Sequence, residues 1–377
     1  MEDAAYTGLK VIDLSQGVAG PYCAMLLAQH GADVIKVEPV EGGDWSRGLG
    51  PRFGDQTAYS IPANLGKRSI ALDLKQEAGR TVLSRLVRGA DVFLQGFRPG
   101  VIDRLGFGYN AVRAIVPSIV YVSISGFGQT GPLAERPAMD PVLQAYTGLT
   151  AENAGEDGIP HRVPIIPIDM TCALYAFAAL AAALHARRDS GRGRHIEASL
   201  MQAGACLQVV RMLQHHLEGG QARPPAAPSG VYRLADGWIN ITVARQHEWV
   251  AFCQAVELPA LTEDTRFAAV EGRTDHAEIL RALLRPVLAP RHFEELSERL
   301  AAHRVMHERL NTYAEFLNQP HVIASGAIGW VAHPAIPGML PLPNVIGAAP
   351  FRDDDPRARA PALSEHNEAI LREHGYS

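Results

Sequence analysis

Residues 160–188 read PHRVPIIPIDMTCALYAFAALAAALHARR. Prolines interrupt the first part of this stretch, and a long Ala/Leu-rich run follows, with a single carboxylate, Asp169, at its beginning. Between Asp169 and Arg187 no side chain is charged at neutral pH, apart from any protonated fraction of His185. A helix that is apolar nearly all round is typical of a buried position. The stretch therefore predicts a long core helix with Asp169 at its mouth, where the first helical N–H groups are unpaired.

Two interpretations of Asp169 follow from this position. Asp is among the preferred N-cap residues, and a cap of this kind stabilises a helix by about 1 kcal/mol. Alternatively, Asp169 is a nucleophilic carboxylate held in a pocket by the amides of the helix end. The local sequence fits both interpretations, so the choice depends on the rest of the chain.

The bulk composition narrows the class of protein. The chain has 377 residues, enough for two domains or for one large α/β domain with an insertion. It is 47% hydrophobic and 20% charged, as ordinary soluble proteins are. The net charge is −5, whereas proteins that bind nucleic acid usually carry a basic excess. We therefore expect a soluble globular protein without a nucleic-acid partner.

The cysteines and the first residues bear on the compartment. Four cysteines are widely spread and form no CxxC pair, so neither a zinc site nor a disulfide framework is indicated. The first residues, MEDAAY, are acidic and lack a signal-peptide pattern. The apolar stretch 170–184 is too short and too rich in Ala to predict a membrane span. The expectation is a cytoplasmic protein without a bound metal.

The order of predicted elements indicates an α/β fold. The first part of the chain alternates apolar β-rich runs with helical periodicity, which predicts a parallel sheet with crossover helices. Ligands of such sheets bind outside the carboxyl ends of the strands, here the turns after Leu14, Gln95 and Ser125. The predicted strands are 9–14, 33–38, 69–74, 91–95 and 119–125, and the predicted helices are 22–30, 76–89 and 109–115.

A change in composition and hydrophobic pattern predicts a second domain. Residues 221–230 are rich in Pro, Ala and Gly and are interpreted as a linker. Residues 231–325 follow as a smaller α+β domain, with a hairpin around Asp236-Gly237 and helical patterns over 246–317. Residues 326–377 are interpreted as a return segment that completes the large, Rossmann-like domain of residues 1–220, with a strand at 329–332 and a helix at 363–371.

Basic residues gather near the Gly-rich turns of the first domain. Scattered Lys and Arg are usually solvated surface, but beside strand ends they are also what a polyphosphate ligand needs. The cluster comprises Lys67, Arg68, Lys75, Arg98 and Arg104.

Several motifs keep one order from about residue 8 to residue 372. They are Gly8–Leu14 with Val18–Pro21, Gly31–Pro39 with Gly43-Asp44, Lys67–Lys75, Phe97–Gly100 with Arg104–Gly106, Ser123–Pro132, Asp140–Gly148, Asp169, Gly191–Gly193 and Pro361–His366. Together they resemble the class III CoA-transferases, the family of formyl-CoA:oxalate and crotonobetainyl-CoA:carnitine CoA-transferases. The resemblance implies transfer of CoA from an acyl-CoA to a carboxylic acid, in a homodimer of two interlocked chains.

The resemblance also implies a site. Asp169 matches the catalytic carboxylate of the family, which forms an aspartyl anhydride and then an aspartyl-CoA thioester, without a metal or a tightly bound cofactor. Lys75, Arg98 and Arg104 match positions that face CoA phosphates, and Leu72 and Phe97 match positions that pack on adenine. Val18, Ala19 and Gly96 match other CoA-lining positions; Gly96 replaces an Asn that is frequent in the family, so a side-chain contact is lost.

Two alternatives stay open. The α-methylacyl-CoA racemases resemble this chain around Asp169, but they pair the carboxylate with a His base at the position of Met139. His161 is the nearby imidazole that could replace that base for proton exchange. The other alternative is a CoA-binding protein without catalysis. The glycine-rich flap of the formyl-CoA enzyme has no counterpart in the chain, which favours an acid other than oxalate.

Overall fold

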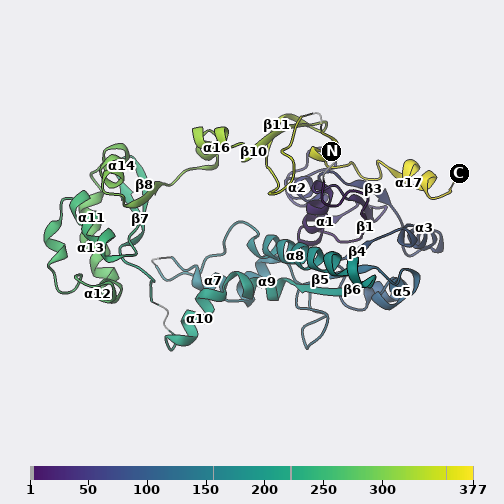
Figure 1. Cartoon of the computed structure of the whole chain (residues 1–377), viewed down its shortest axis with the longest axis horizontal. Helices are drawn as coiled ribbons and strands as arrows, with labels where there is room; N and C mark the ends of the chain where they lie inside the picture. The colour runs from purple at the N-terminus through teal and green to yellow at the C-terminus, as the bar shows by residue number, and fades with distance from the viewer. Residues whose placement is uncertain (1–3, 156, 221–222, 354, 377) are drawn as a thin grey trace. The chain divides into compact units, whose positions relative to one another are not determined.

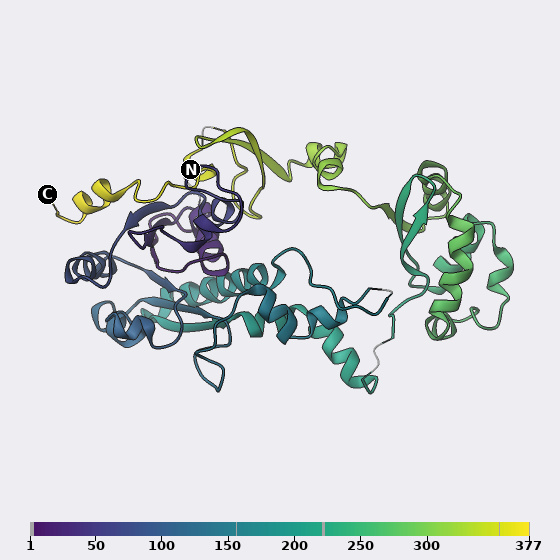
Figure 2. The same ribbon diagram turned by 180° about the vertical axis from the view of Figure 1, so that it is seen from behind.

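The computed structural model describes residues 4–155, 157–220, 223–353 and 355–376. The chain divides into two compact units, a large one of residues 1–209 with 321–377 and a small one, Val210–Pro320 (Figures 1 and 2). The boundary falls within helix α10 (Val209–Leu217), upstream of the segment 221–230 that the sequence indicates as a linker. Each unit is described separately below.

The large unit contains a six-stranded parallel sheet with the strand order β3-β2-β1-β4-β5-β6. The order reverses between β1 and β4, and ligands of open α/β sheets bind outside the carboxyl ends of the strands at such a switch point. The sequence-based prediction of an α/β fold with a parallel sheet is confirmed. The strands are β1 (Lys10–Asp13), β2 (Asp33–Glu38), β3 (Arg68–Ala71), β4 (Val92–Gln95), β5 (Val120–Ser125) and β6 (Arg194–Ser199).

Helices cover both faces of this sheet (Figures 1 and 2). On one face the core joins Val11, Val34 and Val122 to α1 (Ala19–Gln29), α8 (Pro167–Ser190) and α9 (Leu200–Leu207). On the other face it joins alternate strand residues to α3 (Glu77–Arg88), α5 (Tyr109–Ile115) and α17 (Asn367–Glu373). Shorter helices of this unit are η1 (Trp45–Gly48), α2 (Ser60–Asn64), α4 (Val101–Arg104), α6 (Asp140–Tyr146), α7 (Leu149–Glu152) and η3 (Pro356–Ala358).

Helix α8 is less buried than the sequence indicates. Its inner residues, Ile168, Cys172, Ala176 and Leu180, are buried at helical spacing against α1, α9 and the sheet. The opposite face is open: Leu174 and Tyr175 are 53% and 55% exposed. The prediction of a helix buried all round is therefore wrong for the single chain. By length and composition α8 is long and apolar enough to cross a membrane, a test that core helices of soluble proteins also pass.

The return segment forms an antiparallel pair, β10 (Ile328–His333) and β11 (Ile336–Pro343). The sequence predicts the first strand, but the second contains three prolines and is not predicted. Prolines are tolerated at sheet edges, and both strands of a two-stranded sheet are edges. Val331 and Leu342 pack against α1 and α2, which returns this segment to the large unit.

The small unit is an antiparallel sheet covered by helices. Its strand order is β7-β8-β9, and β7 and β8 form the hairpin that Asp236-Gly237 predicts. The core around Trp249, Phe252, Leu280 and Leu296 is fully buried. The elements are β7 (Ser229–Leu234), β8 (Gly237–Thr242), α11 (Gln246–Ala255), η2 (Pro259–Thr262), α12 (Val270–Asp275), α13 (Ala277–Leu288), α14 (Phe293–Ala302), β9 (Met306–Arg309) and α15 (Tyr313–Leu317), with α16 (Pro320–Ser325) leading back to the large unit.

Candidate active site

Asp169 lies inside the first turn of α8. The helix begins at Pro167, whose missing N–H and fixed φ suit the first helical position. The N-cap residue is Ile166, and no side chain of the N-cap residue closes this helix end. The interpretation of Asp169 as the N-cap is therefore wrong.

The carboxylate that closes the N-terminus of α8 belongs to Asp140, at the start of α6. Its Oδ2 accepts hydrogen bonds from the backbone N–H groups of Ile168, at 2.8 Å, and Asp169, at 3.0 Å. Asp140 is 1% exposed. Because these amides are already paired with Asp140, they are not aimed at the side chain of Asp169, contrary to the sequence-based expectation.

Gln144, one turn along α6 and fully buried, fixes this arrangement. Its Nε2 donates to Asp140 Oδ1 at 2.6 Å and to the carbonyl oxygens of Val163 and Ile165 at 3.2 Å each. Its Oε1 accepts from the backbone N–H of Val163 at 3.0 Å. One side chain thus holds both the capping carboxylate and the backbone that leads into α8.

The side chain of Asp169 is partly exposed, and its carboxylate accepts no hydrogen bond from the described residues. Burial, together with the negative charge of Asp140, raises the pKa of Asp169 from 3.8 to about 7. A strongly shifted pKa of this kind is common for catalytic carboxylates. The group is thus a carboxylate whose ionised form is poorly stabilised by its surroundings.

A cavity of about 620 Å³ opens at the carboxyl ends of β1, β2, β3 and β4. Its walls are mostly apolar, and Glu41, Asp73 and Lys75 supply charged groups, whereas the carboxylate of the lining residue Glu38 is buried against Arg47. Three of the predicted CoA contacts, Leu72, Lys75 and Phe97, line this cavity. The remaining lining residues are Leu14, Gln16, Val37, Pro39, Val40, Leu74, Val101 and Leu105.

The other predicted contacts do not line the cavity. Val18 and Ala19 are buried where α1 begins, directly after the turn that carries Gln16. Gly96, Arg98 and Arg104 are exposed around the segment that carries Phe97, Val101 and Leu105.

Two members of the basic cluster are not available to a ligand. Lys67 is buried and donates to Asp13 Oδ2 at 2.8 Å, to Asn64 and to the carbonyl oxygen of Pro21. Arg68 pairs with Asp33 and Glu373. Intramolecular carboxylates therefore already hold these two members of the basic cluster, and neither is among the residues that the family resemblance matches to CoA phosphates.

The cavity and Asp169 lie at the same edge of the sheet. Helix α8 joins the parallel strands β5 and β6, so its N-terminus is at the carboxyl edge of the sheet. The apolar cavity walls belong to the core that packs on α3 and α5, whereas Ile168 and Cys172 belong to the core with α1. A ligand that reaches from the cavity to Asp169 therefore has to cross this edge.

Sequence reasoning missed Asp140, Gln144 and Gln95. Asp140 and Gln144 are part of a recognised motif, and their spacing of four residues places them on one helix face, but that spacing names no partner. Gln95 Oε1 accepts from the backbone N–H of Phe97 at 2.8 Å and so orients a cavity residue. Within the described residues, no group of three or more His, Cys, Asp or Glu side chains could hold a metal ion.

A family model described as CoA-transferase family III matches residues 6–367. The chain belongs to this family. As a member of CoA-transferase family III it is an enzyme, and its activity is CoA transfer from an acyl-CoA to a carboxylate. The predicted family is confirmed.

Named relatives and solved structures agree with this assignment. The chain is 34% identical to the acetyl-CoA:oxalate CoA-transferase of Acetobacter aceti, over 98% of this chain and 95% of that protein. It is 30% identical to the human succinyl-CoA:glutarate CoA-transferase, over 97% and 85%. A CAIB/BAIF family protein from Brucella suis has a TM-score of 0.83 and 32% identity, over 99% and 100%. The orthorhombic crystal form of Rv3272 from M. tuberculosis has a TM-score of 0.85 and 28% identity, over 98% and 99%.

Proposed function

We propose that this family III CoA-transferase moves CoA from an acyl-CoA to a small dicarboxylic acid through covalent intermediates on Asp169. The observation that carries the proposal is the Asp169 carboxylate at the start of α8, partly exposed and without a hydrogen-bond donor among the described residues. Burial, and then the negative charge of Asp140, raises the pKa of Asp169.

The chemistry proceeds in two halves. The Asp169 carboxylate attacks the thioester carbonyl, the C–S bond breaks, and an aspartyl mixed anhydride and CoA thiolate form. The thiolate then attacks the aspartyl carbonyl, which releases the donor acid and leaves an aspartyl-CoA thioester. The acceptor carboxylate repeats the two steps in reverse and leaves as its CoA thioester. One negative charge moves between carboxylate and thiolate throughout, so no net proton transfer is required.

The cavity is proposed to hold the nucleotide part of CoA. Leu72 and Phe97 offer apolar walls for adenine, and Lys75 offers a cation for phosphate. Arg98 and Arg104, both exposed beside the cavity wall, are proposed to add phosphate contacts. Val18, Ala19 and Gly96 are at the edge that the pantetheine arm has to cross on its way to Asp169.

The dicarboxylic acceptor is inferred from the names of relatives. The enzyme of Acetobacter aceti is named for oxalate, the human enzyme for glutarate, and an enzyme of Chloroflexus aurantiacus, 31% identical to this chain, for D-citramalate. Oxalate therefore belongs in the substrate panel, although the missing glycine-rich flap favours other acids.

The test is to trap the intermediate. The enzyme is incubated with acetyl-CoA or succinyl-CoA and treated with hydroxylamine or borohydride, and the peptide containing Asp169 is weighed. We expect a mass change on Asp169 that appears only with an active donor. Asp169→Asn preserves the shape and abolishes both the mass change and turnover, whereas Asp189→Asn, at the far end of the same helix, retains both. Full activity of Asp169→Asn would disprove the proposal.

We further propose that the working enzyme is a homodimer of interlocked chains. The support is the open face of α8, where Leu174 and Tyr175 are more than half exposed, and the nearby apolar surface of α6, where Tyr146 is 50% exposed. Adjoining exposed apolar residues are unusual on a monomer and mark an interaction surface. A second copy of the chain is the proposed partner.

Light scattering after size exclusion is expected to give twice the 40.7 kDa of the chain. Because interlocked chains separate only on unfolding, the dimer mass should persist in urea until the far-UV circular dichroism is lost. Tyr175→Asp should prevent assembly, whereas Tyr313→Asp, at a residue that is 80% exposed in the small unit, should not. A folded, active monomer would contradict the dimer proposal.

A further inference from the structure

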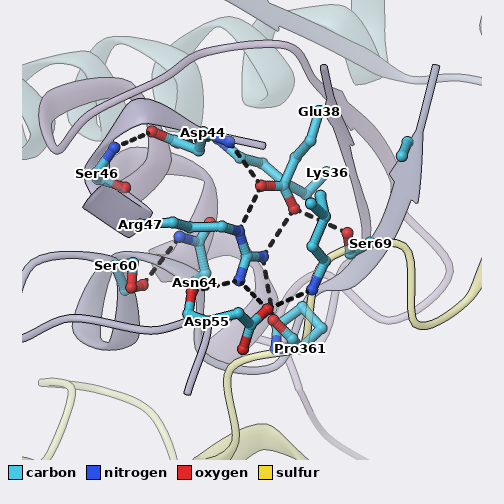
Figure 3. A network of polar contacts seen from close by, with 12 residues as sticks. Lys36, Glu38, Asp44, Ser46, Arg47, Asp55, Ser60, Asn64, Ser69 and Pro361 are labelled. Atoms are coloured by element: carbon cyan, nitrogen blue, oxygen red, sulfur yellow. Dashed lines mark hydrogen bonds and ion pairs between the residues drawn. The ribbon is translucent and has the colours of Figure 1, made fainter. Parts of the chain in front are cut away.

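A buried ionic network contacts the turn between β1 and α1. Figure 3 shows the part of it around Lys36, Glu38, Asp44 and Arg47. Six charged side chains are at most 4% exposed, and their charges balance: Asp13, Glu38 and Asp44 against Lys36, Arg47 and Lys67. Buried charges are costly unless they are paired and hydrogen-bonded, and here each is. The network brings together the ends of β1 and β2, the loop after β2 and the return segment.

Asp44 is the member of this network that reaches the turn. Its Oδ1 accepts from the backbone N–H groups of Gly17, at 2.8 Å, and Ser46, at 2.9 Å. Its Oδ2 pairs with Lys36 Nζ at 2.7 Å, and the same Nζ donates to the carbonyl oxygen of Ser15. Asp44 and Lys36 therefore form hydrogen bonds with the backbone on both sides of Gln16.

These hydrogen bonds fix the backbone conformation of the turn. Gly17 has a φ of +84°, and the ring of Trp45, the residue after Asp44, occupies the place where a side chain would start, 2.2 Å from an ideal Cβ. One backbone step away, Gln16 lines the cavity. The loop after β2 thus determines which groups the turn presents to a ligand.

If the cavity holds CoA as proposed, the thioester passes this turn on its way to Asp169. The sheet order reverses between β1 and β4, and Gly96, which follows β4, lies beside Ser15: a Cβ on Gly96 would be 3.4 Å from that of Ser15. The cavity and Asp169 are on the two faces that meet at this edge. Because Gly96 has no side chain, a ligand can approach the backbone closely beside Ser15.

We propose that Asp44 is a positioning residue for thioester binding, which holds the Ser15–Val18 turn in the form that accepts the ligand as it crosses from the cavity to Asp169. The inference rests on the proposed function, because it takes CoA as the ligand of the cavity. Asp44 itself is buried and acts through Gly17 and Lys36.

The decisive variant is Asp44→Asn. The Asn side chain keeps an oxygen that can accept from Gly17. It removes the ion pair with Lys36, so the interactions that hold the turn become weaker. Hydrogen bonds to charged groups contribute about 1.5–3 kcal/mol, which corresponds to roughly 10- to 160-fold. We expect the Kd of free CoA and the KM of the acyl-CoA to rise at least about tenfold, with kcat and the KM of the acceptor acid changed less than about threefold.

Asp55→Asn is the matched control. Asp55 belongs to the same network through Arg47, at 3.0 Å, but no hydrogen bond joins it to the turn. It should therefore lower the melting temperature without a selective effect on CoA binding. If Asp44→Asn lowers the melting temperature but leaves the Kd and the KM within twofold of wild type, Asp44 is merely structural and the inference is overturned.

Hydrogen exchange of the wild-type enzyme supplies a second test, which does not require the variant to fold. Free CoA should slow exchange in the peptides that carry the 15–18 turn and the 44–47 loop together. If CoA binds but slows exchange in neither peptide, the positioning role is overturned and the proposed function stands. If CoA does not bind to the wild-type enzyme at all, the proposed function itself fails.

Discussion

The carboxylate pair Asp140 and Asp169 gives the enzyme a pH dependence that can be shifted by one substitution. In the proposed mechanism Asp169 has to be ionised to attack a thioester, and burial together with the charge of Asp140 raises its pKa to about 7. At pH 6, therefore, about one tenth of the enzyme carries the nucleophile in its active form, and kcat/KM should fall about tenfold for each further pH unit.

Replacing Asp140 with Asn separates the two causes of this pKa. The Asn oxygen can still accept from Ile168 and Asp169, but the negative charge is gone. The pKa lies about three pH units above 3.8, and burial is the larger cause, so the charge of Asp140 accounts for less than half of the rise, at most about 1.5 pH units. One pH unit corresponds to about 1.4 kcal/mol. The midpoint of the acid limb should then move down from about 7, by no more than about 1.5 pH units.

The assay is kcat/KM for the acyl-CoA between pH 5.5 and 8.5. In wild type the value at pH 6 should be about one tenth of that at pH 8. In Asp140→Asn this fraction should be larger; a fall of one pH unit in the midpoint would make it about one half. The ratio is informative because a weaker helix cap would lower kcat/KM by the same factor at both pH values, and that factor cancels. Asp189→Asn, at the other end of α8, should leave the midpoint unchanged. An Asp140→Asn midpoint within about 0.3 pH units of wild type would refute the electrostatic coupling.

Four further outcomes follow from the same structure. The pKa of Asp169 is raised on folding, so the folded state disfavours its ionisation and the free energy of unfolding falls as the pH rises from about 4 to 7. Asp169→Asn should therefore be more stable than wild type in urea titrations at pH 8, by on the order of 1–3 kcal/mol. This gain should vanish near pH 4. Gln144→Ala removes the donor to buried Asp140 and should cost about 1–3 kcal/mol of stability in urea titrations and at least tenfold in kcat/KM. Lys75→Ala and Phe97→Ala should each raise the KM of the acyl-CoA several-fold, with kcat nearly unchanged in steady-state assays. A 2-methylacyl-CoA incubated in D₂O without an acceptor acid should gain no α-deuterium by mass spectrometry, since a Met occupies position 139.

The elements that the sequence predicts best are those with one strong local signal. The strand 33–38 and the helix 109–115 match the structure residue for residue. Their apolar periodicity is complete within a few residues, so no distant partner is needed to interpret it. By contrast β9, with the sequence Met-His-Glu-Arg, is a strand because it pairs with β8. Its polar residues carry no strand signal, and the sequence predicts helix there.

Charged residues show a related limit. A lysine near a strand end predicts a positive charge but not the partner that neutralises it. Lys67 and Lys75 lie in one motif, yet Lys67 is buried against Asp13 and Lys75 lines the cavity. The choice between them depends on Asp13, which is 54 positions from Lys67 in the chain. Residue type and spacing are therefore sufficient to find the region of the site but not to sort its members.

The same limit applies to Asp169. The sequence does not predict that another residue, Asp140, binds the amides of the helix end, and this changes the chemistry of Asp169. A nucleophile aimed at by free helix amides would be a well-stabilised, unreactive anion. Because Asp140 takes those amides, Asp169 keeps the charge without that stabilisation. The cost is that part of the enzyme is protonated near neutral pH, and with a pKa of about 7 that part is only about half. In the proposed mechanism the remaining anion attacks the thioester more readily, because it has less stabilisation to lose before the transition state is reached.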